Sequence, residues 1–155
     1  LRGGIERRVY IKMSGNSLHY HYVVPGDDFT RAGIASSAVK QTLKQLGLKP
    51  ETVRKMSIAL YEGEINMVIH AYGGEIDVDI NDEKIVAVLK DKGPGIENIE
   101  LAMQEGWSTA SEQVRGLGFG AGMGLPNMKK YADDLIIESK IGVGTTVTVV
   151  VNIGK

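Results

Sequence analysis

Near its amino-terminal end the chain alternates apolar and polar residues in the way that is typical of strands. Two such runs, residues 9–13 and 18–24, flank the turn-forming sequence SGN. After PGDD, where Asp27 or Asp28 could cap a helix, apolar residues recur at helical spacing as far as Gly47. The pattern predicts an amino-terminal hairpin followed by a helix with one apolar face.

A second helical pattern begins at Pro50 and extends to about Ala71, where Tyr-Gly-Gly ends it. Strand patterns follow on both sides of an Asn-Asp turn, and a short helix and two more strands come after a glycine-rich segment. This order predicts an α+β fold, a two-layer sandwich in which helices cover one face of a mixed, mainly antiparallel β-sheet. At this length we expect residues 1–155 to form a single domain.

The second predicted helix is apolar on both sides, and Glu62 lies among its isoleucines. Asn66 follows one turn later, so the two side chains point in the same direction. Because burying an unpaired carboxylate costs several kcal/mol, both side chains are expected to face a polar cavity or a metal ion. The alternative is that Glu62, like the neighbouring Glu64, reaches solvent at the edge of the helix.

The sequence DKGPGI follows a continuously apolar strand. Asp91 at the strand end could accept a hydrogen bond from a ligand amino group, and Gly93 and Gly95 would let the backbone approach a flat ring. The alternative is a simple turn, since the segment is rich in turn-forming residues.

The run GLGFGAGMGLPNM has glycine at every second position through Gly124 and then opens a helix. Free backbone N–H groups at a helix amino terminus suit a phosphate chain, although a flexible linker is the alternative. The sequence contains neither a Walker A motif nor a strict GxGxxG, which argues against those two kinds of nucleotide site.

Composition and charge exclude several classes of function. The net charge is −1, with 18 basic and 19 acidic residues well mixed, so we expect neither a nucleic-acid partner nor a membrane partner. The absence of cysteine excludes disulfides, thiolate metal sites and a cysteine nucleophile, and the three histidines lack the spacing of a metal site. With no apolar run long enough to span a membrane, the expected location is cytoplasmic.

Four segments of the chain, in order, resemble the conserved boxes of the GHKL or Bergerat-type ATP-binding domain. ALYEGEINMVIHAYGG is similar to the N box, DKGPGI and GAGMGL to the two glycine boxes, and IGVGTTVTV to the final glycine-threonine box. Within that superfamily the chain is most similar to the small serine kinases and anti-sigma factors of bacterial partner-switching modules.

This resemblance implies a site for ATP and Mg²⁺. It implies that Asp91 binds the adenine amino group, with Gly93, Gly95 and Thr145 at the same end. Asn66 would complete the shell of a Mg²⁺ ion that phosphate oxygens and water otherwise hold.

The resemblance also implies a catalytic base and a lid. Glu62 would be the general base that takes a proton from the attacking hydroxyl. The residues that would wrap the phosphates as a lid are Gly118, Gly120, Gly122 and Gly124.

The activity implied by the resemblance is that of an ATP-dependent protein serine/threonine kinase that phosphorylates a STAS-type antagonist protein. A sigma factor is a further partner that the resemblance implies, and it suggests a homodimer formed through the amino-terminal strands. Three alternatives stay open: a regulator that binds ATP without turnover, a detached catalytic domain of histidine-kinase type, and an ATPase without a protein substrate.

Overall fold

The computed structural model describes residues 7–10, 17–26, 28–70, 72–104 and 124–153. Its sheet has six strands in the order β1-β2-β3-β4-β6-β5, and every neighbouring pair is antiparallel. The pairing is therefore more uniform than the mixed sheet that the sequence predicts. The strands are β1 (Arg7–Tyr10), β2 (Leu18–Pro25), β3 (Gly73–Ile80), β4 (Lys84–Lys90), β5 (Asp134–Lys140) and β6 (Gly144–Asn152).

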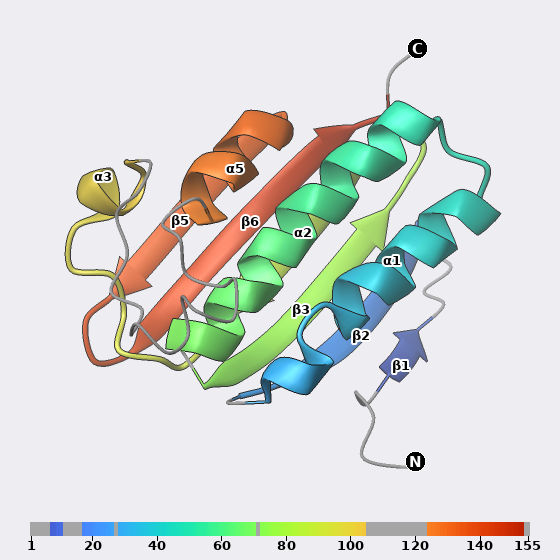
Figure 1. The fold of residues 1–155 in the computed structure, drawn as a ribbon. Helices are drawn as coiled ribbons and strands as arrows, with labels where there is room; N and C mark the ends of the chain where they lie inside the picture. Colours follow the sequence, from blue (N-terminus) through green and yellow to red (C-terminus); the bar gives the residue numbers. More distant parts are fainter. Residues whose placement is uncertain (1–6, 11–16, 27, 71, 105–123, 154–155) are drawn as a thin grey trace.

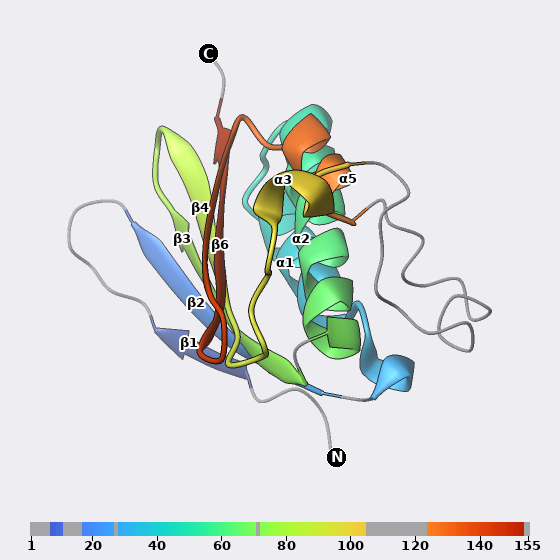
Figure 2. The same ribbon diagram turned by 90° about the vertical axis from the view of Figure 1, so that its left-hand side faces the viewer.

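The helices lie on one face of this sheet, which confirms the predicted α+β sandwich (Figures 1 and 2). Within this layer α2 lies between α1 and α5 and crosses the middle of the sheet (Figure 1). The helical elements are the 3₁₀ turn η1 (Phe29–Arg31), α1 (Ile34–Gln45), α2 (Pro50–His70), α3 (Ile99–Ala102) and α5 (Gly124–Tyr131). In the described residues, none of these helices combines the length and apolar character needed to cross a membrane.

The core lies between the inner face of the sheet and the helices. Alternate residues of the central strands point inward, as the period-2 pattern predicts. On one apolar side of α2 the residues Val53, Met56, Leu60 and Met67 are buried. On the other side Ile65 is buried, and Ile58 and Ile69 are half-buried. The inward-facing strand residues are Ile76, Val78, Ile80, Ile85, Ala87, Leu89, Val147, Val149 and Val151.

Gly63, in the middle of α2, allows this helix to pack closely on its neighbours. A Cβ at this position would lie 2.4 Å from Cδ2 of Leu89 on β4 and 2.9 Å from Cε of Met128 on α5. Glycine inside a helix costs roughly 1 kcal/mol relative to alanine. A larger residue at this position would prevent the close packing of α2 on β4 and α5, which accounts for a glycine inside this helix.

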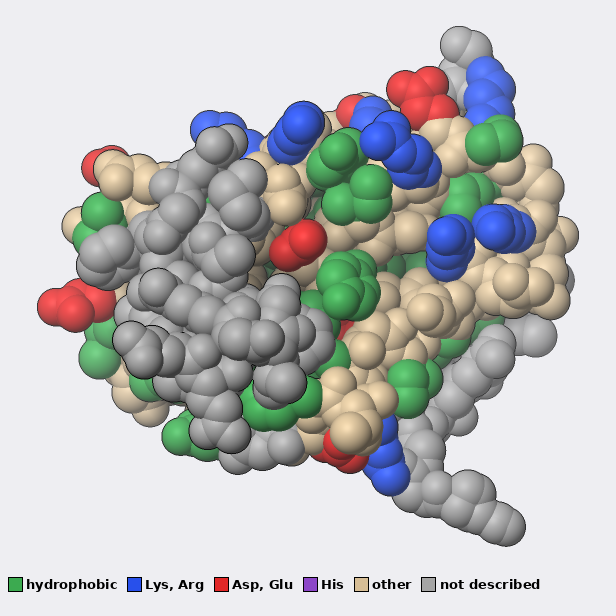
Figure 3. Space-filling model, viewed as in Figure 1, with side chains coloured by type: hydrophobic (Ala, Val, Ile, Leu, Met, Phe, Trp, Pro, Cys, Tyr) green, Lys and Arg blue, Asp and Glu red, His purple; other side chains and the backbone are tan. Residues whose placement is uncertain are grey.

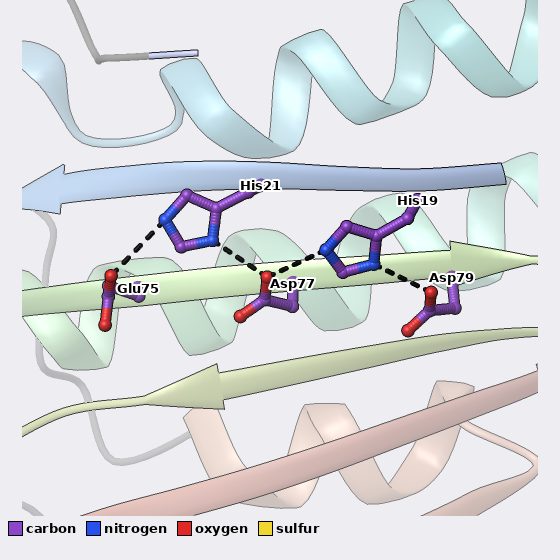
Figure 4. Close-up of polar contacts among 5 residues, drawn as sticks. All are labelled: His19, His21, Glu75, Asp77 and Asp79. Atoms are coloured by element: carbon purple, nitrogen blue, oxygen red, sulfur yellow. Dashed lines mark hydrogen bonds and ion pairs between the residues drawn. The ribbon is translucent and has the colours of Figure 1, made fainter. Parts of the chain in front are cut away.

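The outer face of the sheet carries a row of histidines and carboxylates across β2 and β3 (Figure 4). Oδ1 of Asp77 lies 3.1 Å from Nε2 of His19 and 2.8 Å from Nδ1 of His21. The other ring nitrogens face Asp79 at 2.7 Å and Glu75 at 3.3 Å. These contacts link β2 to β3. Among the described residues, no three or more His, Cys, Asp or Glu side chains are arranged so that they could hold a metal ion.

Candidate functional site

Glu64 is fully buried, and its carboxylate caps the amino terminus of α1. Its Oε2 accepts hydrogen bonds from the backbone N–H groups of Gly33 at 3.0 Å and Ala35 at 3.2 Å, and Oε1 accepts from Ser36 at 2.9 Å. A carboxylate at this position satisfies N–H groups that have no partner within the helix and complements the helix dipole. Glu64 therefore does not reach solvent, and that part of the alternative interpretation is wrong.

The same contacts correct the predicted cap of the first helix. Asp28 precedes the η1 turn and makes no side-chain cap hydrogen bond; it accepts instead from the Thr30 hydroxyl and pairs with Arg31. The other predicted cap, Asp27, lies outside the described residues. The cap comes from α2 because the chain reaches α1 through a separate 3₁₀ turn that carries Asp28 away from the N–H groups of α1.

Glu62, two residues earlier on α2, is half-buried and faces α5. The side-chain amide of Asn127 donates a hydrogen bond of 3.5 Å to its Oε1. Burial raises the pKa of Glu62 above its ordinary value, and the hydrogen bond from Asn127 opposes part of that rise. A carboxylate whose pKa moves toward neutrality is a better proton acceptor at physiological pH.

Asn66 lies one helical turn beyond Glu62, against the first residue of α5. A Cβ on Gly124 would lie 2.8 Å from both Oδ1 and Nδ2 of Asn66. Glycine at this position therefore gives the Asn66 amide the room it occupies. The structure thus brings three predicted site residues, Glu62, Asn66 and Gly124, together between α2 and α5.

Asp91 follows β4 and is tied to the start of β6. Its Oδ1 accepts hydrogen bonds from the backbone N–H groups of Gly93 at 2.9 Å and Thr145 at 3.1 Å, and its own N–H donates to the Thr145 carbonyl at 3.0 Å. Among the described residues Oδ2 has no hydrogen-bond partner. Asp91 is half-buried, so this oxygen suits a ligand that presents an N–H group.

Ser139 supports this end of the site and was not predicted from the sequence. Its hydroxyl lies 2.8 Å from that of Thr145 and accepts a hydrogen bond of 2.7 Å from the N–H of Ile96. Gly95 lies against the carbonyl of Lys140, where a Cβ would come within 2.7 Å. The loop after β4 is therefore fastened to the β5–β6 hairpin.

At position 144, next to Thr145, both the backbone conformation and the nearby carbonyl of Asp91 require a glycine. Its φ of 145° lies in a region that favours glycine, and a Cβ would stand 2.1 Å from the carbonyl oxygen of Asp91. The glycine-threonine pair therefore fixes the position of Asp91 relative to β6.

The Asp91 end of the site lies near the C-terminal end of α2, because Lys90, the last residue of β4, pairs with Glu75 shortly after α2 ends at His70. Gly74, at the start of β3, links them: a Cβ there would lie 2.5 Å from Cε of Met67 on α2 and 3.1 Å from Cα of Asp91. Gly74 therefore lies between the end of the Met67 side chain and the backbone of Asp91.

The remaining predicted lid residues, Gly118, Gly120 and Gly122, lie outside the described residues. Within the described part, the arrangement offers a carboxylate oxygen for an N–H donor, an amide oxygen suited to a hard cation, and a half-buried carboxylate suited to accept a proton. These are groups that a Mg²⁺-bound purine nucleotide can use. Asn127 and Ser139 belong to this arrangement without a signal in the sequence, because each acts through a contact made only in the fold.

Comparison with known proteins defines the class of this chain. Residues 28–151 match the family of histidine kinase-like ATPase domains. The chain belongs to this family, which confirms the resemblance that the four sequence segments suggest, and the family implies a site for ATP.

Within that class the chain is similar to proteins named anti-sigma F factor. It is 34% identical over 134 residues to that of Caldanaerobacter subterraneus subsp. tengcongensis and to that of a Thermoanaerobacter species, covering 83% of this chain and 87% of each relative. It is 28% identical over 143 residues to that of Clostridium beijerinckii, covering 88% of this chain and 94% of the relative.

Proposed function

We propose that this chain is a protein serine/threonine kinase that uses ATP and Mg²⁺ to phosphorylate a STAS-type antagonist protein. The observation that carries the proposal is the half-buried carboxylate of Glu62, whose pKa is raised by burial and which lies one helical turn from Asn66. A site that only binds nucleotide has no need of a proton acceptor at this position.

The proposed roles follow the donors and acceptors of each side chain. Oδ2 of Asp91 accepts a hydrogen bond from the adenine amino group, while Gly93 and Thr145 hold Oδ1 in place. Gly95 keeps the adenine loop against the β5–β6 hairpin, and Asn66 offers its amide oxygen to Mg²⁺. The lid residues Gly118, Gly120, Gly122 and Gly124 complete the proposed site.

Bound ATP would supply the phosphoryl group. Glu62 accepts the proton of a seryl or threonyl hydroxyl, whose oxygen forms the new bond to the γ-phosphorus while the bond to the bridging oxygen breaks and leaves ADP. Asn127 holds Oε1 of Glu62 by its hydrogen bond, so the carboxylate keeps one direction.

The test is transfer of labelled phosphate from ATP to a STAS-domain protein of the same cell. The Glu62→Gln variant should transfer phosphate about 10²- to 10⁴-fold more slowly, which is the usual contribution of a positioned general base. Its affinity for ATP, measured by calorimetry, should stay the same. Glu51→Gln, an exposed position in the first turn of the same helix, is the matched control. Equal transfer by Glu62→Gln and the unmodified chain would refute the role of Glu62.

A regulator that binds without turnover is the second candidate, and the name anti-sigma F factor of the similar proteins favours it. It predicts a sigma factor retained only when ATP is present, with no phosphorylated partner. Acid-labile phosphate on the acceptor would instead indicate a catalytic domain of histidine-kinase type. We place the reaction in the cytoplasm. We further propose that a sigma factor is a second partner and that two copies of the chain pair through their amino-terminal strands.

A further inference from the structure

An open groove of about 490 Å³ runs between the C-terminal half of α1 and the N-terminal half of α2, away from the candidate site. We call the apolar lining residues that are buried or half-buried its floor, and the exposed cationic lining residues its sides. The floor includes Leu48, Val53 and Ile58, and the sides include Lys40, Lys44 and Arg54. Arg54 precedes Glu62 on α2 by eight residues, which is about 12 Å along a helix axis.

Positive charge is concentrated around this groove although the whole chain has a net charge of −1. Residues 34–58 contain five basic side chains and a single acidic one, Glu51, which gives this segment a charge of +4. Figure 3 shows Lys and Arg side chains over the C-terminal half of α1 and the N-terminal half of α2.

The two lysines of α1 are available to a partner. Lys40 and Lys44 are exposed and one turn apart, so their like charges repel each other. Neither has a carboxylate within ion-pair distance in the described part of the chain. Lys55, by contrast, is already paired with Asp133 at 2.7 Å. A carboxylate brought between Lys40 and Lys44 would replace repulsion by attraction.

The floor of the groove decides which kind of anionic partner fits. A nucleic-acid backbone or a small anion would use the cationic sides and leave the apolar floor unpaired. A helix with leucine-like residues on one side and carboxylates beside them would use both, because a third helix packs naturally along the groove between two others.

We propose that this groove binds an acidic amphipathic helix of a partner protein. The helix lies between α1 and α2, with apolar side chains toward Leu48 and Ile58 and carboxylates toward Lys40 and Lys44. The guanidinium of Arg54, at the α2 edge of the groove, lies over the Tyr131 ring, 5.5 Å from its centroid. The inference is independent of the proposed phosphotransfer, since none of these residues belongs to the nucleotide site.

The test uses a fluorescent synthetic peptide of about 15 residues with leucine at every third or fourth position and glutamate between, a length of about four helical turns. Fluorescence anisotropy without nucleotide, at an ionic strength of about 0.15 M, measures its affinity for the full chain. The variant Lys40→Glu with Lys44→Glu should lower that affinity at least about tenfold, because like charges then face each other.

The matched control is Lys84→Glu with Lys90→Glu, which makes the same change of net charge at exposed positions on β4 and should alter the affinity less than about twofold. Circular dichroism checks that each variant folds. If the variant Lys40→Glu with Lys44→Glu does not fold, the variant Lys40→Gln with Lys44→Gln takes its place in the binding assay. Three results would overturn the proposal: no saturable binding, equal loss with the β4 control, or equal binding of a leucine-free glutamate peptide or a single-stranded oligonucleotide.

Discussion

Glu62 and Glu64 stand two residues apart on α2, and their carboxylates have different surroundings and different partners. Glu64 is fully buried and accepts three backbone hydrogen bonds at the start of α1. Glu62 is half-buried and is held by a single hydrogen bond from α5. Successive residues of a helix are separated by about 100°, so this spacing directs the two side chains to opposite sides. Glu64 therefore joins α2 to α1, whereas Glu62 faces α5.

Replacing Glu64 with alanine should destabilise the whole fold. Three buried N–H groups of α1 would lose a charged acceptor, and we expect a loss of at least about 3 kcal/mol in the free energy of unfolding. Urea denaturation followed by circular dichroism measures it. Glu97→Ala, at an exposed loop position, is the control and should change stability by less than about 0.5 kcal/mol. A loss as small as that of the control would mean that the cap contributes little.

Replacing Glu62 with glutamine should stabilise the protein at neutral pH. Burial raises the pKa of Glu62 in the folded state, so folding favours the protonated carboxyl and opposes its ionisation. The stability that Glu62 contributes is therefore present below its ordinary pKa of 4.5 and is lost as pH rises through the raised value.

Thermal unfolding at several pH values tests this expectation. The variant should have the higher Tm at neutral pH, and the difference should shrink as pH falls toward the ordinary pKa of glutamate. A variant that is less stable than the unmodified chain at neutral pH would contradict the assigned direction. Glu51→Gln, exposed on the same helix, should show no such pH dependence.

The arrangement of strands and helices could be predicted because the patterns of the sequence are strong. Period-2 runs mark the strands, and α2 was expected from Pro50 to about Ala71 and is observed as Pro50–His70. The short helix α3 was missed, since its four residues show no helical period. The sequence pattern does not predict the cap of α1, because Glu64 supplies it from 28 positions after Ser36. Sequence neighbours alone favour the nearby Asp28.

The site was predictable only in part, for a similar reason. Asp91, Thr145 and Gly93 are brought together as expected. Local sequence cannot separate Glu62 from Glu64, because both lie in one short motif and only the position of α1 decides which is used as a cap. Asn127 contributes through a contact between two helices that no spacing along the chain reveals.

Replacing Asp91 with asparagine should affect nucleotide binding more than stability. The asparagine oxygen can still accept from Gly93 and Thr145, but the second carboxylate oxygen becomes an amide that donates. A donor facing the adenine amino group should lower the affinity for ATP by about tenfold to a hundredfold.

Isothermal titration calorimetry with ATP and Mg²⁺ measures this effect, and Asp134→Asn, an exposed aspartate at the start of β5, is the control. Unchanged affinity in Asp91→Asn would show that Asp91 does not contact the base. A large loss of Tm in the same variant would instead point to a structural role.

Replacing Gly124 with alanine should disturb Asn66. The added methyl group would lie 2.8 Å from both polar atoms of the Asn66 side chain, closer than real Cβ contacts allow, so the amide must rotate. We expect ATP affinity to lose its dependence on Mg²⁺, while the free energy of unfolding changes by no more than about 1 kcal/mol.

Titration of ATP with and without Mg²⁺ checks this. Lys129→Ala, exposed on the same helix, should leave the Mg²⁺ effect intact. If Gly124→Ala binds ATP with the same Mg²⁺ dependence as the unmodified chain, Asn66 is not the side chain that holds the ion.

The position of β6 has a consequence for how the protein is made. β6 lies between β4 and β5, so Lys84 pairs with Asn152 and Ile85 with Val151. A ribosome releases β4 long before it has synthesised β6, and during that interval the strand has an open, apolar edge. Pairing between segments so distant in the chain is intrinsically slow. Until β6 is synthesised and inserts beside it, β4 therefore presents an unpaired edge of the kind that favours aggregation.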